Sequence, residues 1–313
     1  MFLPFPSARG DRLKFTSIGH ANIDITLFVP ELPAPDEDVK VQASMIGTGG
    51  AASNFAICVK RLGEEAELLA VVGDDLFGKF FLERLVKQGV NVSNVEVAKG
   101  TSTGMVVVIN EVGKQRRMIS VSGANARMNS EIIQKWSTAI SEADFVHVAS
   151  LEIENALVIA EERDDLSWDP GTKVVRLGLE KLKPMFSSLR VILLNREETR
   201  LLAGRNDIKD AIRFLSDLGP EEVVVKLGAN GSMAFVDAVF YEAPALSPLV
   251  VDTTGAGDVF DATYLVSRAR GYDVEEALKL ANVASALKIS RPGTTKGIPT
   301  WEEVLVVKST FYD

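Results

Sequence analysis

The chain has 313 residues, of which 46% are hydrophobic and 25% are charged, and its formal net charge is −9 at pH 7. This is the balance of an ordinary globular protein, with enough chain for one large domain or two smaller ones. The acidic charge and the lack of any Lys/Arg-rich run argue against a nucleic-acid partner, because such binding needs a clustered positive face.

Short apolar runs alternate with longer helical patterns along almost the whole chain. Continuous apolar runs are typical of strands covered on both faces, and they occupy Phe15–Gly19, Leu68–Val72, Phe145–Ala149, Arg190–Asn195 and Val223–Leu227. The i, i+3, i+4, i+7 spacing of one buried helix face is clearest at Leu280, Val283, Ala284 and Leu287. This alternation predicts an α/β protein with a largely parallel central sheet and helices on both sides.

Two pairs of extended segments lack an intervening helix. They are Asp24–Val29 with Val39–Ser44, and Gly104–Asn110 with Arg117–Ser122. A hairpin turn at residues 111–114 is expected in the second pair. We expect a small sheet that stands off the main body as a lid or an interface. Its segments, about 24–44 and 104–122, would be inserted into a single domain covering residues 1–313.

The single cysteine, Cys58, permits no internal disulfide and indicates a reducing compartment. Its apolar neighbours predict a buried side chain. The longest apolar runs, such as residues 105–109, are far too short to span a membrane, and the chain starts without a secretory pattern. We therefore expect a cytoplasmic protein with no membrane partner.

The stretch VVDTTGAGDVF, residues 250–260, has an unusually bare backbone. We expect a short strand at Leu249–Val251 and a helix after Asp258. A glycine loop between them leaves backbone N–H groups without partners at a helix N-terminus, where the dipole adds partial positive charge. Glycines also remove the side chains that would keep a phosphate away. The loop is therefore a ready anion site.

Asp258 would point at that same site. A carboxylate repels a bound phosphate, so its presence makes sense if it accepts a proton from a hydroxyl that attacks the phosphate. The alternative is an acid that merely complements the helix dipole, and the stretch alone does not separate the two.

The sequence resembles the ribokinase-like carbohydrate kinases, also called the phosphofructokinase B family. DTTGAGD (252–258) is similar to their C-terminal signature. GGAASNFA (49–56), followed by Gly63 and Gly73, is similar to their N-terminal signature. Other motifs extend the resemblance over nearly the whole chain. It implies a three-layer α/β sandwich with a small β-sheet lid, and a kinase that uses ATP and Mg²⁺.

The resemblance implies a role for each part of the glycine loop. Asp258 would be the catalytic base. The anion hole for the transferring phosphoryl group would be formed by the N–H groups of Gly255, Ala256 and Gly257. Asp252 and Thr254 match positions that, in many relatives, help to bind a monovalent cation such as K⁺.

Other motifs imply the two binding sites. On the acceptor side, GHANIDI (19–25), the first signature and SLE (150–152) imply contacts from Asn22, Asp24, Gly49, Gly50, Asn54 and Glu152. On the nucleotide side, NREE (195–198), KLGANG (226–231) and ANVASALKISRPGTTKGIP (281–299) imply contacts from Asn195, Glu198, Lys226, Gly228, Gly231 and Asn282. Glu198 would serve Mg²⁺ through water.

Departures from the family pattern leave the sugar open. Ala51 stands where ribokinases proper usually carry lysine. Thr263 stands where the family usually has Gly or Ala, a departure that concerns the packing of the local helix and not the glycine loop. SGAN (122–125), by contrast, resembles the PGAN of ribokinases. His20 and His147 lack a third ligand at metal spacing and are expected to be structural, and Trp168-Asp169-Pro170 is expected to end a strand.

We therefore expect an ATP-dependent, Mg²⁺-requiring sugar kinase of ribokinase type, dimeric through the small sheet. The alternatives are a nucleoside kinase, a kinase for 2-keto-3-deoxygluconate or another sugar, and a non-catalytic ligand sensor. GTGGAA (47–52) also fits a dinucleotide fingerprint. A Rossmann fold places that motif in the first strand–helix turn, whereas here a lid strand precedes it.

Overall fold

The computed structural model describes residues 12–111, 113 and 117–312. The strands of its main sheet are β1 (Lys14–Gly19), β4 (Glu65–Leu69), β9 (Phe145–Ala149), β10 (Leu166–Asp169), β11 (Leu189–Asn195), β12 (Glu222–Lys226), β13 (Ser232–Val236) and β14 (Val239–Ala243). They lie in the order β14-β13-β12-β11-β10-β9-β1-β4. The pairings from β4 to β12 are parallel, and β13 and β14 extend the sheet by antiparallel pairing. The predicted largely parallel sheet is confirmed.

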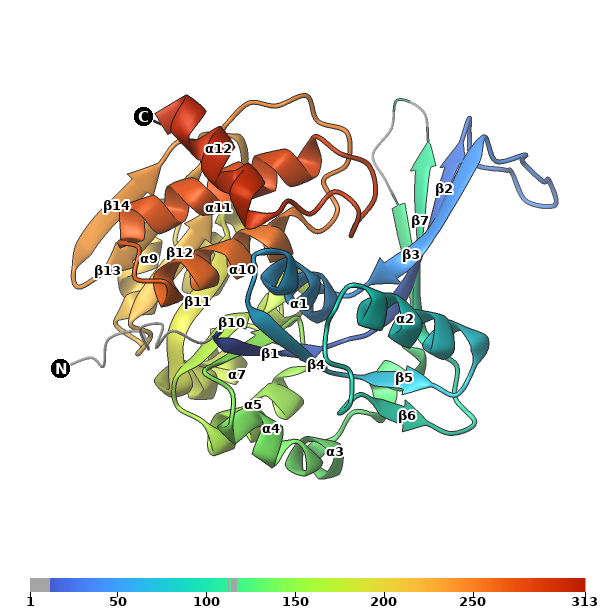
Figure 1. Cartoon of the computed structure of the whole chain (residues 1–313), viewed down its shortest axis with the longest axis horizontal. Coiled ribbons are helices and arrows are strands. Elements are labelled where there is room, and N and C mark those ends of the chain that lie inside the picture. Colours follow the sequence, from blue (N-terminus) through green and yellow to red (C-terminus); the bar gives the residue numbers. More distant parts are fainter. Residues whose placement is uncertain (1–11, 112, 114–116, 313) are drawn as a thin grey trace.

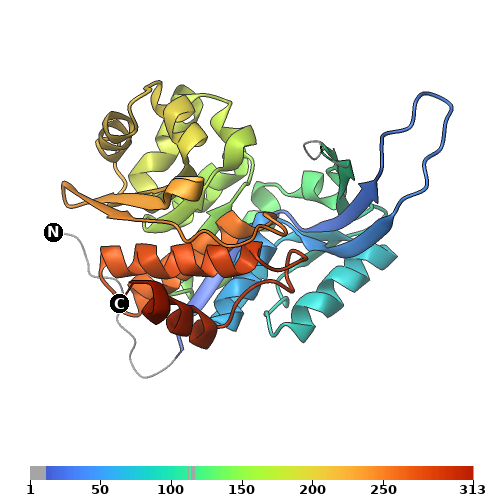
Figure 2. The same ribbon diagram turned by 90° about the horizontal axis from the view of Figure 1, so that it is seen from above.

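Helices cover both faces of this sheet, as Figures 1 and 2 show. One face packs against α1 (Ala51–Arg61), α2 (Leu76–Lys87), α10 (Ala256–Ala269), α11 (Val274–Ile289) and α12 (Trp301–Tyr312). The other packs against α3 (Ser130–Lys135), α4 (Ser137–Ser141), α5 (Ile153–Glu162), α6 (Gly171–Val175), α7 (Leu179–Leu182), α8 (Arg196–Ala203) and α9 (Ile208–Ser216).

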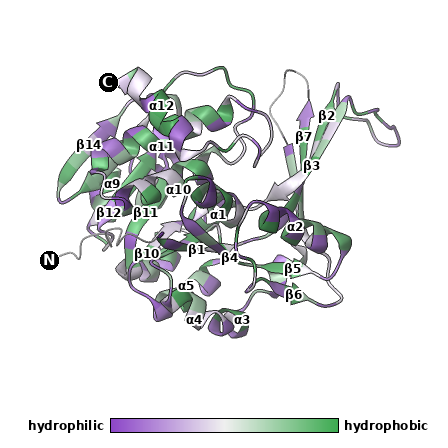
Figure 3. Ribbon diagram, viewed as in Figure 1, coloured by the Kyte–Doolittle hydropathy of each residue, from purple (hydrophilic) through white to green (hydrophobic). Residues whose placement is uncertain are grey.

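Short 3₁₀ turns are η1 (Gly123–Arg127), η2 (Lys183–Ser188) and η3 (Gly228–Asn230). The apolar colour of the inner strands in Figure 3 matches two cores, one on each face of the sheet. Strands buried on both faces lose the alternating pattern, which is why the sequence marks them as continuous runs. Within the described ranges, every helix is too short or too polar to cross a membrane.

The apolar run Leu68–Val72 is divided between two sheets. β4 ends at Leu69, whereas β5 (Val71–Gly73) pairs in parallel with β6 (Glu96–Ala98) in a separate small sheet. Both parts are buried, so their apolar character could not show where the chain leaves the main sheet.

The second sheet, which we call the lid sheet, consists of β2 (Asn22–Val29), β3 (Ala43–Gly49), β7 (Gly104–Glu111) and β8 (Arg117–Val121). Its order is β3-β2-β7-β8, with β2 and β7 parallel and the outer pairs antiparallel. It projects from the body of the molecule (Figures 1 and 2). The small sheet is therefore confirmed. The predicted turn at 111–114 falls largely outside the described residues.

The predicted strand Val39–Ser44 is wrong in its bounds. β3 begins at Ala43 and continues to Gly49, with Ala43 opposite Phe28 and Gly49 opposite Asn22. Glycine has a low strand propensity, so Gly47 and Gly49 concealed the end of this strand. Because β3 is an antiparallel lid strand, it is not the parallel strand that a dinucleotide fingerprint requires.

The predicted strand Leu249–Val251 is also wrong. These residues lie outside every sheet of the described chain, and Leu249 is 83% exposed. Instead of a neighbouring strand, the N–H groups of Val251 and Asp252 contact one carbonyl at the end of α11, that of Ile289, at 2.7 and 3.1 Å. The predicted helix is confirmed and begins at Ala256, so Asp258 lies in its first turn.

Candidate active site

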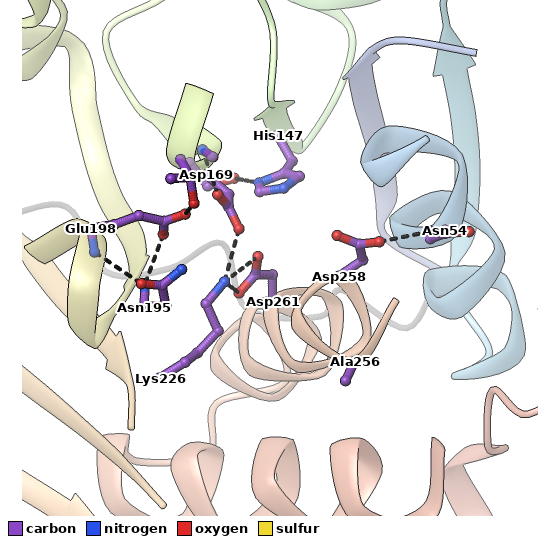
Figure 4. Close-up of polar contacts among 12 residues, drawn as sticks. Asn54, His147, Asp169, Asn195, Glu198, Lys226, Ala256, Asp258 and Asp261 are labelled. Carbon is purple, nitrogen blue, oxygen red and sulfur yellow. Dashed lines mark hydrogen bonds and ion pairs between the residues drawn. The ribbon is translucent and has the colours of Figure 1, made fainter. Parts of the chain in front are cut away.

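The parallel strands bring polar side chains to one edge of the main sheet. Asp169 ends β10, Asn195 ends β11 and Lys226 ends β12, and Asn195 and Lys226 are partners in the strand register. The carboxyl ends of parallel strands are where open α/β sheets bind ligands. Figure 4 shows these residues on one side of the first turn of α10, with Asp258 on the other.

The glycine loop leads directly into α10. Gly255 is the residue before the helix and has φ 78°, a left-handed conformation that favours glycine. The N–H of Ala256 makes a long contact, 3.3 Å, with the carbonyl of Thr253. In the described part of the chain, the N–H groups of Gly255 and Gly257 have no hydrogen-bond acceptor at this helix end. These donors and the helix dipole therefore favour an anion here.

Asp258 contacts the first signature across the sequence. Asn54 Nδ2 in α1 donates to Asp258 Oδ2 at 2.7 Å (Figure 4). Burial raises the pKa of Asp258 to about 6, and the Asn54 hydrogen bond only partly offsets that effect. Oδ1 of Asn54 is itself buried and has no hydrogen-bond partner among the described residues. The Asp258 carboxylate, which can accept a proton, and the unsatisfied Oδ1 of Asn54 thus lie together beside the glycine loop.

Asp24 lies close to Asp258 from the lid side. Its pKa is raised to about 6 by burial and then by the charges of Asp258 and Asp252. Gly49 leaves room for this carboxylate, because a Cβ at Gly49 would lie 2.1 Å from Asp24 Oδ1. The chain then turns at Gly50, which has φ 99°. The structure therefore brings the predicted acceptor residue Asp24 to the predicted base.

Asn22 is held by a residue that the sequence did not identify as part of the site. Asn125 Nδ2 donates to Asn22 Oδ1 at 2.8 Å, and Asn125 Oδ1 accepts from the N–H of Ala21 at 3.0 Å. Asn125 is buried and belongs to SGAN. The likeness of SGAN to PGAN does not by itself assign a role to Asn125, but this asparagine was the signal that the sequence offered.

Glu152 is paired with His20 at the ends of the neighbouring strands β9 and β1. His20 Nε2 and Glu152 Oε2 lie 2.8 Å apart. Burial raises the pKa of Glu152, but the hydrogen bond and charge of His20 outweigh it, so the pKa lies below its usual value. The other histidine, His147, is buried against Phe55, and burial lowers the pKa of its ring to about 3.

Lys226 lies between two carboxylates. Its Nζ is 2.8 Å from Asp169 Oδ2 and 2.9 Å from Asp261 Oδ1 (Figure 4). Burial lowers the pKa of Lys226, but the two charges outweigh it and raise the pKa above its usual value. A Cβ on Gly257 would lie 3.6 Å from this ammonium, so Lys226 lies next to the glycine loop. The sequence analysis predicted Asp169 only as the end of a strand and did not identify Asp261 at all. Asp261 follows Asp258 by one helical turn, and this spacing was the available signal.

Asn195 and Glu198 form a capping box at the start of α8, with the N–H of each backbone bonded to the side chain of the other at 2.9 Å. Burial raises the pKa of Glu198, and the nearby charge of Asp169 raises it further. The described residues include no cluster of three or more His, Cys, Asp or Glu side chains arranged to hold a metal. Mg²⁺ bound mainly by nucleotide phosphates and water needs one or two carboxylates. The oxygens of Glu198 already accept hydrogen bonds from Thr172 and Asn195, so this carboxylate would serve the ion through water.

The remaining nucleotide-side residues lie around the β12–β13 turn and α11. A Cβ on Gly228 would meet nothing within 4 Å, whereas one on Gly231 would lie 2.0 Å from the carbonyl of Ala243. Asn282 Nδ2 donates to the carbonyls of Ala243 and Pro244 at 3.1 and 3.2 Å. The amide of Asn282 therefore fixes the chain after β14, and its predicted contact with adenine stays a prediction.

A family model described as pfkB family carbohydrate kinase matches residues 12–301. The chain is 29% identical over 306 residues to the ATP-dependent ribose-1-phosphate kinase of Halopiger xanaduensis, covering 96% of this chain and 100% of that protein. Ribokinase from Thermotoga maritima superposes with a TM-score of 0.84 at 27% identity, over 94% of this chain and 98% of that one. Arabidopsis thaliana ribokinase complexed with ribose and ATP gives a TM-score of 0.85 at 25% identity, over 95% and 99%. These likenesses confirm the predicted ribokinase-like fold.

Proposed function

The chain belongs to the pfkB family of carbohydrate kinases, and from that premise we propose that it transfers the γ-phosphoryl group of ATP to a hydroxyl of a small sugar, as a ribokinase does. One observation carries the proposal. The Asp258 carboxylate, with its raised pKa, is held by Asn54 beside the Gly255 and Gly257 amides, which have no acceptor among the described residues. A base in that place can take a proton from an alcohol as the alcohol attacks a phosphate.

In the proposed reaction the acceptor hydroxyl donates to Asp258, which takes its proton as the oxygen attacks the γ-phosphorus. The bond between the γ-phosphorus and the β–γ bridging oxygen breaks, and ADP leaves with that oxygen. Charge on the transferring group meets the N–H donors of Gly255, Ala256 and Gly257. These donors are fixed in the backbone, so they need little reorganisation as the charge develops. The Lys226 ammonium beside Gly257 is neutralised by its ion pairs with Asp169 and Asp261, so the stabilising charge comes from the backbone donors and the helix dipole.

The acceptor would be held between the sheet edge and the lid sheet. Asp24 and the unsatisfied oxygen of Asn54 accept hydrogen bonds from its hydroxyls, while Asn125 orients Asn22. Gly49 leaves room for the Asp24 carboxylate and Gly50 for the His20 carbonyl, so these glycines would shape the acceptor site through their neighbours, and Glu152 would bound its far side. Closure of the lid sheet would exclude water, which otherwise competes as the acceptor.

The nucleotide would lie along the ends of β11 and β12 and against α11, in contact with Asn195, Glu198, Lys226, Gly228, Gly231 and Asn282. Glu198 would hold Mg²⁺ through water, and the ion would supply positive charge to neutralise the nucleotide phosphates. We also propose that residues 1–313 act as a single domain, and that two copies dimerise through the lid sheet.

The test is ATP consumption over an acceptor panel of D-ribose, 2-deoxyribose, ribose 1-phosphate, fructose, 2-keto-3-deoxygluconate and nucleosides. Product analysis would identify the phosphorylated hydroxyl. We expect saturable, acceptor-dependent ADP formation with a free pentose. Ribose 1-phosphate is included because a relative bears that activity in its name.

The outcomes separate the alternatives. Turnover with a nucleoside or with 2-keto-3-deoxygluconate alone would keep the reaction and replace the acceptor. If sugars bind, as measured by calorimetry, while none supports ADP formation, the protein is a sensor and the proposed reaction is wrong.

A further inference from the structure

The oxygens of Asp252, which the sequence predicts as part of a monovalent-cation site, are already engaged. Its Oδ1 accepts from the N–H of Thr254 at 2.9 Å, and its Oδ2 from the N–H of Gly293 at 3.1 Å. Its carbonyl oxygen accepts from Lys288 Nζ at 3.1 Å. A cation bound by these oxygens would compete with three donors, one of which is the Lys288 ammonium, so Asp252 does not fit a K⁺ ligand.

Lys288 itself is unusual because its side chain is fully buried, at 0% exposure. It comes from the last turn of α11, and its stem is enclosed by the loop after that helix. A Cβ on Gly297 would lie 3.1 Å from Lys288 Cδ. Burying an ammonium is costly unless nearby groups compensate its charge. The interior position of this lysine therefore needs an electrostatic reason.

The compensating charges are carboxylates at the two ends of the glycine loop. Burial lowers the pKa of Lys288, while the charges of Asp252 and Asp258 act against that fall. In return, the Lys288 charge acts to lower the pKa of Asp258. The ammonium bonds the backbone three residues before Gly255, where the chain enters the loop. It is thus an internal positive charge where the chain enters the glycine loop, and its covalent attachment fixes its place.

We propose that the Lys288 ammonium takes the place of a monovalent cation: it anchors the Asp252 carbonyl, keeps the glycine loop in shape and makes nucleotide binding independent of K⁺ and Na⁺. Lys288 is a positioning residue, since it acts on the phosphate through the loop. The effect on turnover rests on the proposed kinase function, whereas the effect on loop stability does not.

The experiment compares the wild type, Lys288→Met and the control Lys279→Met. Lys279 lies on the same helix but pairs at the surface with Glu275 and Glu276. Each protein is measured in tetramethylammonium, sodium and potassium chloride at equal ionic strength. The readouts are the thermal midpoint without ligand, ADP affinity by calorimetry, and acceptor-dependent turnover.

We expect the wild type and Lys279→Met to respond equally to all three salts. Lys288→Met should bind ADP about tenfold more weakly in tetramethylammonium and regain affinity in potassium, with a matching rise in its thermal midpoint. A wild type whose ADP affinity rises about tenfold with K⁺ would overturn the proposal, as would a folded Lys288→Met that ignores salt. If Lys288→Met does not fold, the salt response of the wild type decides alone. Absence of turnover with salt-independent midpoints would count against the kinase function and not against the anchor.

Discussion

Asn54 and Asp258 are 204 positions apart in the sequence, yet one hydrogen bond of 2.7 Å joins them. The two signature motifs that carry them were recognisable in the sequence, but this contact was not, because it depends on α1 and α10 packing side by side. Burial of Asp258 then raises its pKa to about 6. A residue type could be predicted here, whereas its ionisation could be read only from its surroundings.

Asp258→Asn should reduce acceptor-dependent turnover by about 100- to 10,000-fold, the range that general base catalysis contributes. The amide keeps the contact with Asn54 but cannot take a proton. ADP affinity should be retained, because phosphate repulsion is removed. Steady-state kinetics and calorimetry check both, with Asp217→Asn at the exposed end of α9 as the matched control. Retention of most turnover would contradict the role of Asp258 as the base.

The same carboxylate predicts a pH dependence. Because its pKa in the folded protein is raised to about 6, Asp258 is ionised and competent above that pH and becomes protonated as the pH falls through it. We therefore expect kcat/KM to decline below about pH 6, reinforced by Asp24, whose pKa is also raised to about 6.

The linked effect on stability has the opposite sign. A carboxyl group whose pKa is higher in the folded than in the unfolded state binds its proton more tightly when folded, so its protonation stabilises the fold. Asp258→Asn should accordingly melt no lower than the wild type at pH 8. A pH–rate profile that stays flat down to pH 5 would contradict the assignment.

At the scale of elements, the sequence marked helices and doubly buried strands well, since periodicity and continuous apolar runs report burial. The sequence analysis failed where contacts with segments distant in the sequence determine the local structure. Leu249–Val251 has the composition of a strand but finds no neighbouring strand, and β3 contains glycines that strands usually avoid. The charge of Lys226 and its pairing with Asp169 and Asp261 were also out of reach, because three separate elements supply them.

Two glycines of β3 make a matched test of the lid sheet. A methyl group at Gly49 would overlap the Asp24 carboxylate at 2.1 Å, whereas one at Gly47 meets nothing within 4 Å. Gly49→Ala should therefore raise the KM for the acceptor about tenfold or more, through displaced hydrogen bonds, with little change in ATP affinity. Gly47→Ala should behave as the wild type. Equal kinetics for both variants would show that Asp24 does not bind the acceptor.

At the scale of the whole molecule, the alternation of strand and helix patterns in the sequence predicted the layers and the parallel sheet. The same patterns do not predict whether two copies of the chain associate. The lid sheet carries a row of apolar residues in register across its four described strands: Ile46, Ile25, Val107 and Ile119. The two residues at the ends of this row are exposed to solvent, Ile46 by 53% and Ile119 by 59%. Exposed apolar patches often mark interaction surfaces, which favours the proposed dimer.

Ile119→Asp should convert that dimer to monomers, because a carboxylate cannot be buried in an apolar interface without a large loss of free energy. Sedimentation velocity over a range of protein concentrations measures this directly. Val86→Asp on exposed α2 is the control. A wild type that sediments as a monomer at every concentration would contradict the dimer proposed through this sheet.

One residue separates β3, an edge strand of the lid sheet, from helix α1. β3 ends at Gly49, Gly50 turns the chain, and α1 begins at Ala51, with the Asn54 N–H bonded to the Gly50 carbonyl at 3.0 Å. The Asn54 side chain already bonds Asp258 in this structure, so a movement of β3 would be transmitted to this contact through a single residue. If the proposed acceptor binds against β3, strain introduced in the lid sheet would therefore reach the proposed base directly.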